Sequence, residues 1–431
     1  MDRTTRATVW VAAAAIVALA TAAPARAQNP GGALYVQCPG DLNGDAVPDG
    51  PVNPNSKVKC MHLAAGDGFI TMADGRPLYI FGFSDQTGVP LSQVMGEGAL
   101  SANSPAPTIR LKEDQEFYLN LTNVGMVLRP DLFDPHSVHF HGFPQAAPVF
   151  DGVPESSAVV NMGATYSYYY KIIEPGTYMY HCHVEATEHM QMGMLGNLYV
   201  EPQQNTGVVR ARDIATGELT GPTLCTVDRA RLDGAVSGPL GYAYNDCDGT
   251  TAYDVEKEIQ IISMDPDFHT MSENVQPLPF AAMDDKYPMF NGRGYPDTVN
   301  TGVISTGTDR GTKPSQPVHS FVEATAGQRI LLRLSNLAVT RFYTVASTIP
   351  MKVVGGSARL RRGPAPAPNV NGTNLYYDTN SVTLGGGEAV DVIIDTTDYA
   401  PGTYLLYTTN LNYLSNDGQD FGGMMTEILI K

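Results

Sequence analysis

Residues 175–183 read PGTYMYHCH, and residues 401–409 repeat the pattern as PGTYLLYTT. A second pair of segments, QEFYLNLTN at 115–123 and QRILLRLSN at 328–336, repeats in the same order along the chain. Short runs rich in tyrosine, threonine and leucine, bounded by glycine and proline, are typical of β-strands. The two repeated pairs therefore predict two copies of one β-sandwich unit.

The composition also indicates a mostly β chain. Its 431 residues include 43 glycines and 31 prolines, and long amphipathic helical periods are few. We therefore expect short, peripheral helices, and two or three domains, because this length is too great for one core. The formal charge of −17 argues against nucleic acid and anionic lipid as partners, since an acidic surface repels both.

The first 27 residues have the pattern of a bacterial export signal. Two arginines precede an apolar run over residues 9–23, and residues 25–27 read ARA, a small-x-small cleavage site. The run is too short and too rich in alanine for a membrane span, and no later segment is long enough for one. We expect an exported protein, periplasmic or secreted, that starts near Gln28. Losing one acidic and three basic residues would leave it 43 acidic and 24 basic side chains.

Five cysteines follow the export signal, and four of them form two local pairs. Cys38 with Cys60 and Cys225 with Cys247 each enclose a loop rich in glycine, aspartate, asparagine and proline, which a disulfide would stabilise. Cys182 is then left without a partner. An unpaired thiol in an oxidising compartment needs a reason, such as burial or metal binding.

The neighbours of Cys182 predict a copper site. His181 and His183 flank it, and His189 and Met194 follow in the sequence HCHVEATEHMQMGM. One thiolate, two imidazoles and a weak axial thioether are the donor set that selects copper. The alternatives are a zinc or other nitrogen–sulfur site, or a metal-free cluster of packed side chains.

The second imidazole is expected from residues 135–142, which read PHSVHFHG. Side chains alternate between the faces of a strand, so His139 and His141 point one way and His136 points the other. By the same rule Cys182 faces away from the two histidines that flank it. We therefore expect two sites, with His136 beside Cys182 at the first and the other histidines at the second.

These segments resemble the multicopper oxidases, the laccase-like group built from cupredoxin domains. Residues 136–142 match the family pattern His-x-x-His-x-His-Gly, and residues 181–183 match its His-Cys-His pattern. The resemblance implies an all-β fold of two cupredoxin-like Greek-key β-sandwich domains. It further implies a type 1 copper held by His136, Cys182, His189 and Met194, a type 2 copper held by His139, and type 3 coppers held by His141, His181 and His183.

The loop after His183 departs from the family pattern. Five residues separate His183 from His189, where the family usually has three. The spacing from His189 to Met194 is the usual one, so we interpret the difference as a two-residue insertion. Met192 is a competing axial ligand.

The second copy of the repeat lacks these ligands. Residues 407–409 read YTT where residues 181–183 read HCH, and no histidine follows His319. With the segment FNGRGYPDT at 290–298, this copy resembles the copper-free middle domain of three-domain laccases, and we expect a structural or oligomer-forming role. The predicted organisation is an export signal at 1–27, an N-terminal disulfide loop segment at 28–60, a copper-binding cupredoxin domain at 61–202, a connector with a disulfide loop at 203–255, and a second cupredoxin-like domain at 256–431.

The histidine count predicts a site shared between chains. The family's oxygen-reducing cluster uses eight histidines, and this chain offers four by motif, namely His139, His141, His181 and His183. Two first domains that face each other across a two-fold axis would supply all eight, which requires a homodimer or a larger even assembly. The predicted function is an exported copper-dependent oxidoreductase that takes electrons from an unidentified donor and passes them to dioxygen.

Two other functions are compatible with the motifs. A copper nitrite reductase-like enzyme also keeps its type 1 site in the first of two cupredoxin domains, but the usual histidine motif of its second domain is absent here. A copper carrier or electron-transfer cupredoxin would use Met190, Met192 and Met194 near the surface to bind cuprous ion.

The N-terminal loop has the spacing of a calcium site. Asp41, Asn43, Asp45 and Asp49 are the candidate ligands, but alanine and valine stand where a glycine and a bidentate acid are expected. The alternative, which these departures favour, is a solvated loop held by the bridge between Cys38 and Cys60.

Overall fold

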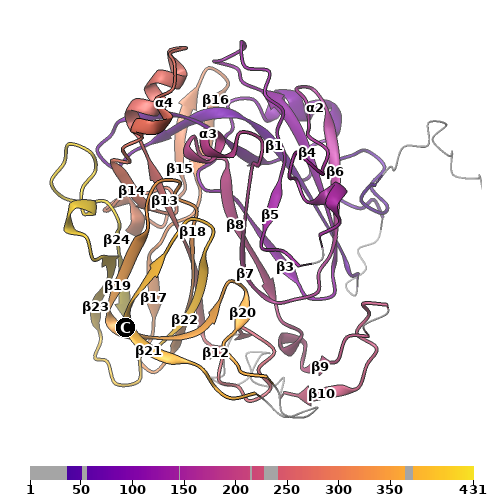
Figure 1. Ribbon diagram of the computed structural model, residues 1–431, viewed down its shortest axis with the longest axis vertical. Coiled ribbons are helices and arrows are strands. Elements are labelled where there is room, and N and C mark those ends of the chain that lie inside the picture. The colour runs from indigo at the N-terminus through magenta and orange to yellow at the C-terminus, as the bar shows by residue number, and fades with distance from the viewer. Residues whose placement is uncertain (1–35, 51–55, 145, 214–215, 228–240, 365–371) are drawn as a thin grey trace, which may run out of the picture. The chain divides into compact units, whose positions relative to one another are not determined.

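The computed structural model describes residues 36–50, 56–144, 146–213, 216–227, 241–364 and 372–431 (Figure 1). The expected export signal at 1–27 lies outside these residues. Residues 37–431 form one compact unit. Within the described part of the chain, no helix is long and apolar enough to cross a membrane.

The first β-sandwich consists of two four-stranded sheets, with the orders β2-β1-β4-β6 and β3-β8-β7-β5. The two sheets share a core, because the ring of Phe117 in the first sheet packs against Phe140 in the second, with centroids 6.2 Å apart. The strands are β1 (Val58–Thr71), β2 (Pro77–Asp85), β3 (Ala106–Lys112), β4 (Glu116–Gly125), β5 (His139–His141), β6 (Thr165–Lys171), β7 (Gly176–His181) and β8 (Leu195–Glu201).

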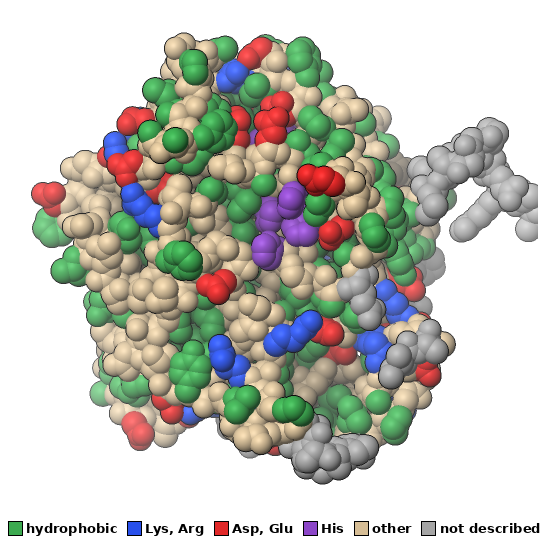
Figure 2. Space-filling view, viewed as in Figure 1, with side chains coloured by type: hydrophobic (Ala, Val, Ile, Leu, Met, Phe, Trp, Pro, Cys, Tyr) green, Lys and Arg blue, Asp and Glu red, His purple; other side chains and the backbone are tan. Residues whose placement is uncertain are grey.

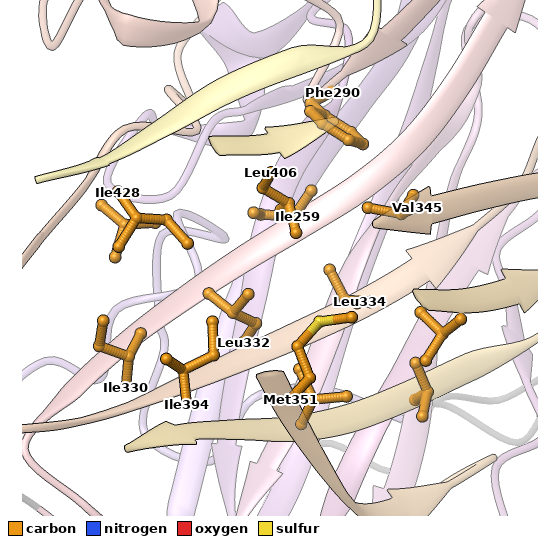
Figure 3. Close-up of a cluster of buried hydrophobic side chains, with 14 of the residues drawn as sticks. Ile259, Phe290, Ile330, Leu332, Leu334, Val345, Met351, Ile394, Leu406 and Ile428 are labelled. Carbon is orange, nitrogen blue, oxygen red and sulfur yellow. The ribbon is translucent and has the colours of Figure 1, made fainter. Parts of the chain in front are cut away.

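The second β-sandwich is a continuous path of strands in the order β14-β13-β18-β22-β19-β23-β24-β17, with β20 and β21 paired to β19. The long strand β19 joins the two halves, since one part of it pairs with β23 and another with β22. Its core is built from buried aliphatic side chains such as Ile259, Leu332 and Val345 (Figure 3). The strands are β13 (Val255–Met264), β14 (Tyr287–Phe290), β17 (Val322–Ala324), β18 (Arg329–Asn336), β19 (Tyr343–Gly356), β20 (Arg359–Leu360), β21 (Tyr377–Leu384), β22 (Ala389–Asp395), β23 (Gly402–Thr408) and β24 (Met425–Ile430).

The two sandwiches repeat the same strand pairings. β4 pairs in parallel with β1 and antiparallel with β6, and β18 pairs in parallel with β13 and antiparallel with β22. β7 pairs antiparallel with β8, as β23 does with β24. The repeated sequence segments lie on these equivalent strands, which confirms the prediction of an all-β chain with two copies of one sandwich unit.

The remaining elements are short, as the composition predicts. In the described part of the chain, three α-helices, several short 3-10 helices and several small hairpins lie between the strands. The helices are α2 (Leu91–Glu97), α3 (Ala186–Gln191) and α4 (Pro266–Glu273), and the hairpins pair β9 (Val208–Arg210) with β10 (Thr223–Thr226), β11 (Gly241–Tyr242) with β12 (Ala252–Tyr253), and β15 (Ile304–Thr308) with β16 (Gly311–Gln316).

A buried charge network joins the sandwiches. Arg333 on β18 forms ion pairs with Glu256 and Asp391, and all three side chains are almost completely buried. Thr177 of the first sandwich donates a hydrogen bond to Asp391 and accepts one from Arg333. The Thr177 hydroxyl thus links the first sandwich to a buried charge network of the second, and its loss would leave buried polar groups without a partner.

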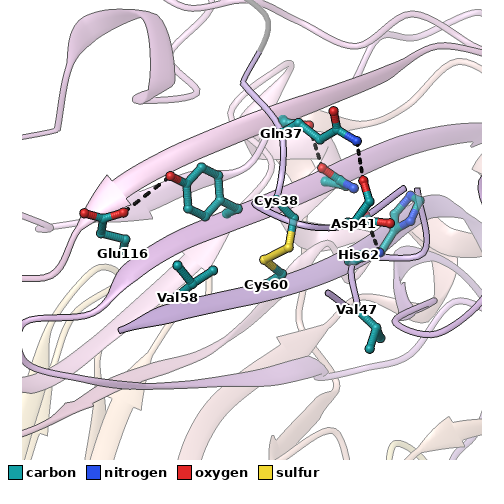
Figure 4. Close-up of a disulfide and its surroundings, with 12 residues drawn as sticks. Gln37, Cys38, Asp41, Val47, Val58, Cys60, His62 and Glu116 are labelled. Atoms are coloured by element: carbon teal, nitrogen blue, oxygen red, sulfur yellow. Dashed lines mark hydrogen bonds between the residues drawn. A yellow bond between two sulfur atoms is a disulfide. The ribbon is translucent and has the colours of Figure 1, made fainter. Parts of the chain in front are cut away.

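Both predicted disulfides are present. Cys38 pairs with Cys60 on β1, so the N-terminal loop is tied to the first sandwich (Figure 4). Cys225 on β10 pairs with Cys247. Cys182 is the one free cysteine among the described residues, and it is buried. The spacing of the cysteines therefore predicted the pairing correctly.

Candidate metal centres

The first centre, which we call the thiol centre, consists of His136, Cys182 and His189. Their ligand atoms all lie within 4.8 Å of one another. The Cys182 Sγ atom lies 3.3 Å from His189 Nδ1 and 3.8 Å from His136 Nδ1. All three side chains are fully buried. The structure thus brings together three residues that are up to 53 positions apart in the sequence.

Backbone hydrogen bonds fix the elements that carry these side chains. Cys182 follows the last residue of β7, and its N–H donates to the Met194 carbonyl at 3.1 Å. Met194 in turn donates its N–H to the His189 carbonyl at 2.8 Å. His136 is held by a β-bridge to Val160. The candidate ligands therefore sit on a framework fixed by backbone hydrogen bonds.

The loop between His183 and His189 forms a helix. α3 begins at Ala186, and Glu185 is its N-cap residue. The Glu185 backbone carbonyl accepts a hydrogen bond from the His189 N–H at 3.0 Å. Residues 186–188 of this loop thus lie in a helical turn that carries His189 into the core. Met192 and Met194 are both fully buried, so the expectation that these two methionines lie near the surface is wrong.

Burial controls the protonation of the thiol centre. It lowers the pKa of His189 to about 4 and that of His136 well below its usual value, so both imidazoles are neutral at pH 7. It raises the pKa of the Cys182 thiol to about 11. A cation with affinity for sulfur would displace the thiol proton and find two free imidazole lone pairs beside the thiolate. The donor set therefore fits copper.

The second centre, which we call the histidine centre, contains His139, His141, His181 and His183. Ligand atoms of the first three lie within 4.8 Å of one another, and His141 Nδ1 is 3.2 Å from His181 Nε2. The His183 ring lies 5.0 Å from the His139 ring, measured between centroids. Strand pairing explains the grouping, because His139 on β5 lies directly opposite His181 on β7.

Carbonyl groups orient two of these rings. The Asp151 carbonyl lies 2.7 Å from His139 Nδ1, and the Cys182 carbonyl lies 2.8 Å from His181 Nδ1. A carbonyl only accepts, so each Nδ1 carries the proton and each Nε2 keeps a free lone pair. Burial lowers the pKa of His139 and His141, and lowers that of His181 to about 3. His139, His141 and His181 are thus neutral imidazoles suited to a cation.

The two centres lie on opposite faces of the same strands. His181 belongs to the histidine centre and Cys182, the next residue, belongs to the thiol centre. The predicted alternation of side chains agrees with this geometry. The chain therefore joins the two centres through a single peptide segment.

The histidine centre opens into a pocket of about 280 Å³. Its other wall comes from the second sandwich and includes Leu337, Ala338, Val339, Gly386 and Gly387. Figure 2 shows histidine side chains gathered at the surface on this face of the molecule. Among the described residues, this wall offers no ligating side chain to the histidine centre.

The backbone of Gly387 lies close to His141 of the histidine centre, so a side chain added at Gly387 should disturb that centre. Its φ is +88°, and an added Cβ would lie 2.8 Å from His141 Nε2. We expect Gly387→Ala to push His141 aside and to lower oxygen consumption at least about tenfold without loss of visible colour. Gly327→Ala is the matched control, because its φ is +90° and no atom lies within 4 Å of the added Cβ. Equal effects of the two substitutions would show that backbone strain alone is responsible.

Three carboxyl groups beside the thiol centre were not predicted from the sequence. Asp134 and Glu185 form a further group with His189, in which all ligand atoms lie within 4.8 Å. Burial raises the pKa of both, and it raises the pKa of the neighbouring Glu188 to about 7. No motif marks these residues, since loop residues from two separate segments meet only in the folded chain.

The three histidines outside the motifs lie outside both centres. His62 forms a hydrogen bond with Thr122, and His269 contacts two backbone carbonyls. His319 lies 3.3 Å from Lys257 Nζ. In the second sandwich the strand equivalent to β7 ends at Thr408, so residues 407–409 occupy the position of the His-Cys-His segment without its ligands.

Carboxylates of the N-terminal loop accept hydrogen bonds from the backbone of the same loop. Asp41 accepts hydrogen bonds from the backbone N–H groups of Gly44, Asp45 and Ala46, and Asp49 accepts one from Leu42. Asn43 donates to Asp45. Among the described residues, the aspartates of this loop are not part of a group of three or more ligand atoms within 4.8 Å of one another. Calcium binding here stays a prediction, and the bonding agrees with a loop held by its disulfide.

The sequence of the first sandwich is similar to that of known copper proteins. Residues 93–205 match the sequence profile of the multicopper oxidases. The chain is similar to copper resistance protein A of Pseudomonas syringae pv. tomato, with 34% identity over 107 residues that cover 25% of this chain and 16% of that protein. It is also similar to an L-ascorbate oxidase of Cucurbita pepo var. melopepo, with 32% identity over 117 residues that cover 26% and 18%. The matches thus span less than a fifth of each relative's length.

Solved structures show the same fold over most of the chain. A blue copper oxidase from Nitrosomonas europaea aligns with a TM-score of 0.56 and 20% identity, covering 86% of each chain. The multicopper oxidase mgLAC aligns with a TM-score of 0.55 and 18% identity, covering 87% of this chain and 86% of its own. A copper nitrite reductase from Nitrosomonas europaea aligns with a TM-score of 0.53 and 14% identity, covering 87% and 94%. At these identities the likeness establishes a cupredoxin-like fold.

Proposed function

We propose that this chain, whose residues 93–205 match the multicopper oxidase profile, is a copper-dependent oxidoreductase that passes electrons from a donor to dioxygen. The observation that carries the proposal is the thiol centre, a buried unpaired thiol between two neutral imidazoles. A copper ion there would supply reversible one-electron chemistry. The ligands would be His136, Cys182, His189 and Met194, and Met192 remains the alternative to Met194.

The protein matrix around the thiol centre excludes water and fixes the ligands. The three side chains are fully buried, and the His189 ring packs edge-on against Phe81 with centroids 5.8 Å apart. This close packing would limit rearrangement of the ligands when a bound copper ion gained or lost an electron. The direct peptide link between Cys182 and its flanking histidines then offers a short covalent path to the histidine centre.

We further propose that the histidine centre reduces dioxygen after it is completed by another chain. His139 would hold a type 2 copper, and His141, His181 and His183 would hold type 3 coppers. One chain supplies half of the eight histidines that the family uses, and the pocket wall from the second sandwich supplies none. A homodimer or larger even assembly would bring two such half-sites together. Four electrons and four protons then convert one dioxygen to two waters.

Export is part of the same proposal. The expected signal at 1–27 would deliver the chain to the periplasm or outside the cell, and the two disulfides agree with an oxidising compartment.

The domain boundaries predicted from the sequence, with a copper-binding domain at 61–202 and a second domain at 256–431, remain predictions as well.

A copper carrier is the principal alternative, because the histidine centre is incomplete in one chain. The burial of Met192 and Met194 weighs against it, since a carrier must hand its ion to a partner at the surface. A nitrite reductase-like enzyme has less support, because no histidine follows His319 in the second sandwich.

The proposed assembly can be tested by dissociation. We expect copper-loaded protein, diluted until light scattering shows monomers, to lose oxygen consumption with hydroquinone as donor. Its visible colour should persist, because the four proposed type 1 ligands lie in one chain. Monomers that consume oxygen at the full rate would contradict a site shared between chains.

A further inference from the structure

The first half of strand β13 carries a lysine on the face that forms the core of the second sandwich. β13 pairs with β18 without a break in register from Val255 to Ile261, so alternate side chains share a face. Ile259 and Ile261 on this face belong to the aliphatic core, and Val255 packs against it. Lys257 lies between Val255 and Ile259. A lysine at a core-facing position departs from the pattern of the strand, and such departures are typical of functional sites.

Lys257 and His319 line a pocket of about 300 Å³. The Lys257 Nζ atom lies 3.3 Å from His319 Nδ1 and 3.4 Å from His319 Nε2. Val255, Phe321 and Val322 supply apolar walls. The pocket therefore combines two nitrogen-containing side chains with an apolar surface, which is the usual composition of a site for a small organic ligand.

The two acidic residues that line the pocket already have basic partners. Glu256 accepts hydrogen bonds from Arg333 at 2.5 Å and from Arg110 at 2.7 Å. Glu323 forms an ion pair with Lys431 at 2.7 Å. Both carboxylates are thus engaged by basic side chains other than the lysine of the pocket.

Lys257 is left without a carboxylate partner in the described part of the chain. Burial lowers its pKa, and Glu258 on the opposite face of β13 offsets only part of this effect. Burial also lowers the pKa of His319 to about 4, so this imidazole is neutral at pH 7. The charge of Arg293 lowers both pKa values further, and among the described residues its hydrogen bonds go to backbone carbonyls, including that of Asn300 at 2.6 Å. The pocket is therefore electropositive and favours an anion.

We propose that this pocket binds a small organic carboxylate, with Lys257 and His319 at the carboxylate group and the apolar walls around the rest of the ligand. An ammonium group donates charge-assisted hydrogen bonds to a carboxylate, and the neutral imidazole donates one more through its protonated nitrogen. The volume of about 300 Å³ is large enough for a ligand the size of benzoate. None of the residues that line the pocket belongs to either metal centre, so the inference does not depend on the proposed oxidase function.

The ligand arm of the test titrates copper-loaded protein with benzoate, with its neutral analogue benzamide and with sulfate in a calorimeter. We expect benzoate to bind at least about tenfold more tightly than benzamide, because only benzoate carries a charge for Lys257. We expect it to exceed sulfate as well, because sulfate has no apolar body. Benzoate that binds no more tightly than either of the other two, or that does not bind, would overturn the proposal.

The variant arm assigns the binding to the pocket through Lys257→Met. Methionine is unbranched and suits a core-facing position, so we expect folded protein in which benzoate binds at least about tenfold more weakly and benzamide binds as before. Lys352→Met is the matched control, because Lys352 is partly exposed and pairs with Asp378 at 2.8 Å, and it should leave both affinities unchanged. If Lys257→Met binds benzoate as tightly as the wild type does, the carboxylate binds elsewhere, such as at copper, and the proposal is wrong. The comparison of ligands on the wild-type protein needs no variant, so it tests the proposal even if Lys257→Met does not fold.

Discussion

Replacing Cys182 with serine is expected to abolish the visible absorption of the copper-loaded protein and to reduce its oxygen consumption to background. A serine hydroxyl does not ionise near neutral pH and binds copper weakly, whereas a thiolate gives intense charge-transfer absorption. Serine is nearly the same size, so the buried site should keep its packing. Absorption spectra and an oxygen electrode measure the two effects.

The control for this substitution is His319→Ala. His319 lies in the second sandwich beside Lys257 and belongs to neither centre, so colour and turnover should be retained. A wild-type protein that is replete with copper and colourless would contradict a copper-bound Cys182. A Cys182→Ser protein that keeps the visible absorption would also contradict a copper-bound Cys182.

Replacing His139 with alanine is expected to give the opposite combination, with colour kept and oxygen consumption lost. His139 belongs to the histidine centre on the other face of the strands, and its Nδ1 is oriented by the Asp151 carbonyl. The thiol centre is built from other side chains, so its ligands remain in place. Reduction of the coloured centre by hydroquinone without oxygen should proceed, while reoxidation by dioxygen should stop.

Two results would contradict this account of His139. Bleaching would show that the two centres are not separable, because a substitution in one would have destroyed the other. Full oxygen consumption would show that dioxygen is reduced without His139. Loss of folded protein is checked by far-ultraviolet circular dichroism, and His139→Gln supplies a second variant that keeps a polar side chain at the position.

The fold and the thiol centre were largely predictable because their signals are local in the sequence. Side chains alternate on a strand, so HCH at 181–183 separates Cys182 from its neighbours, and HSVHFH at 136–141 divides its histidines in the same way. The repeated segments fall on equivalent strands, and each disulfide closes one short loop. Each of these inferences needs only short motifs, their repetition or spacing along the chain, and strand geometry.

The features that were missed depend on contacts between distant segments. Nothing in the sequence around Gly387 indicates that its backbone approaches His141 of the other sandwich. Asp134 and Glu185 carry no motif, and they meet at His189 only because α3 turns that histidine towards residues just before His136. The helical form of the ligand loop was also missed, because two extra residues in a loop do not reveal their conformation.

The copper content of the purified assembly, measured by mass spectrometry of the metal and divided by the number of chains, tests the central claim most directly. The account predicts more than one copper per chain, with one copper at each thiol centre and further copper held where histidine centres of different chains meet. Chains that retain no more than one copper each in a fully coloured preparation would contradict an oxygen-reducing cluster and would leave a copper carrier in its place.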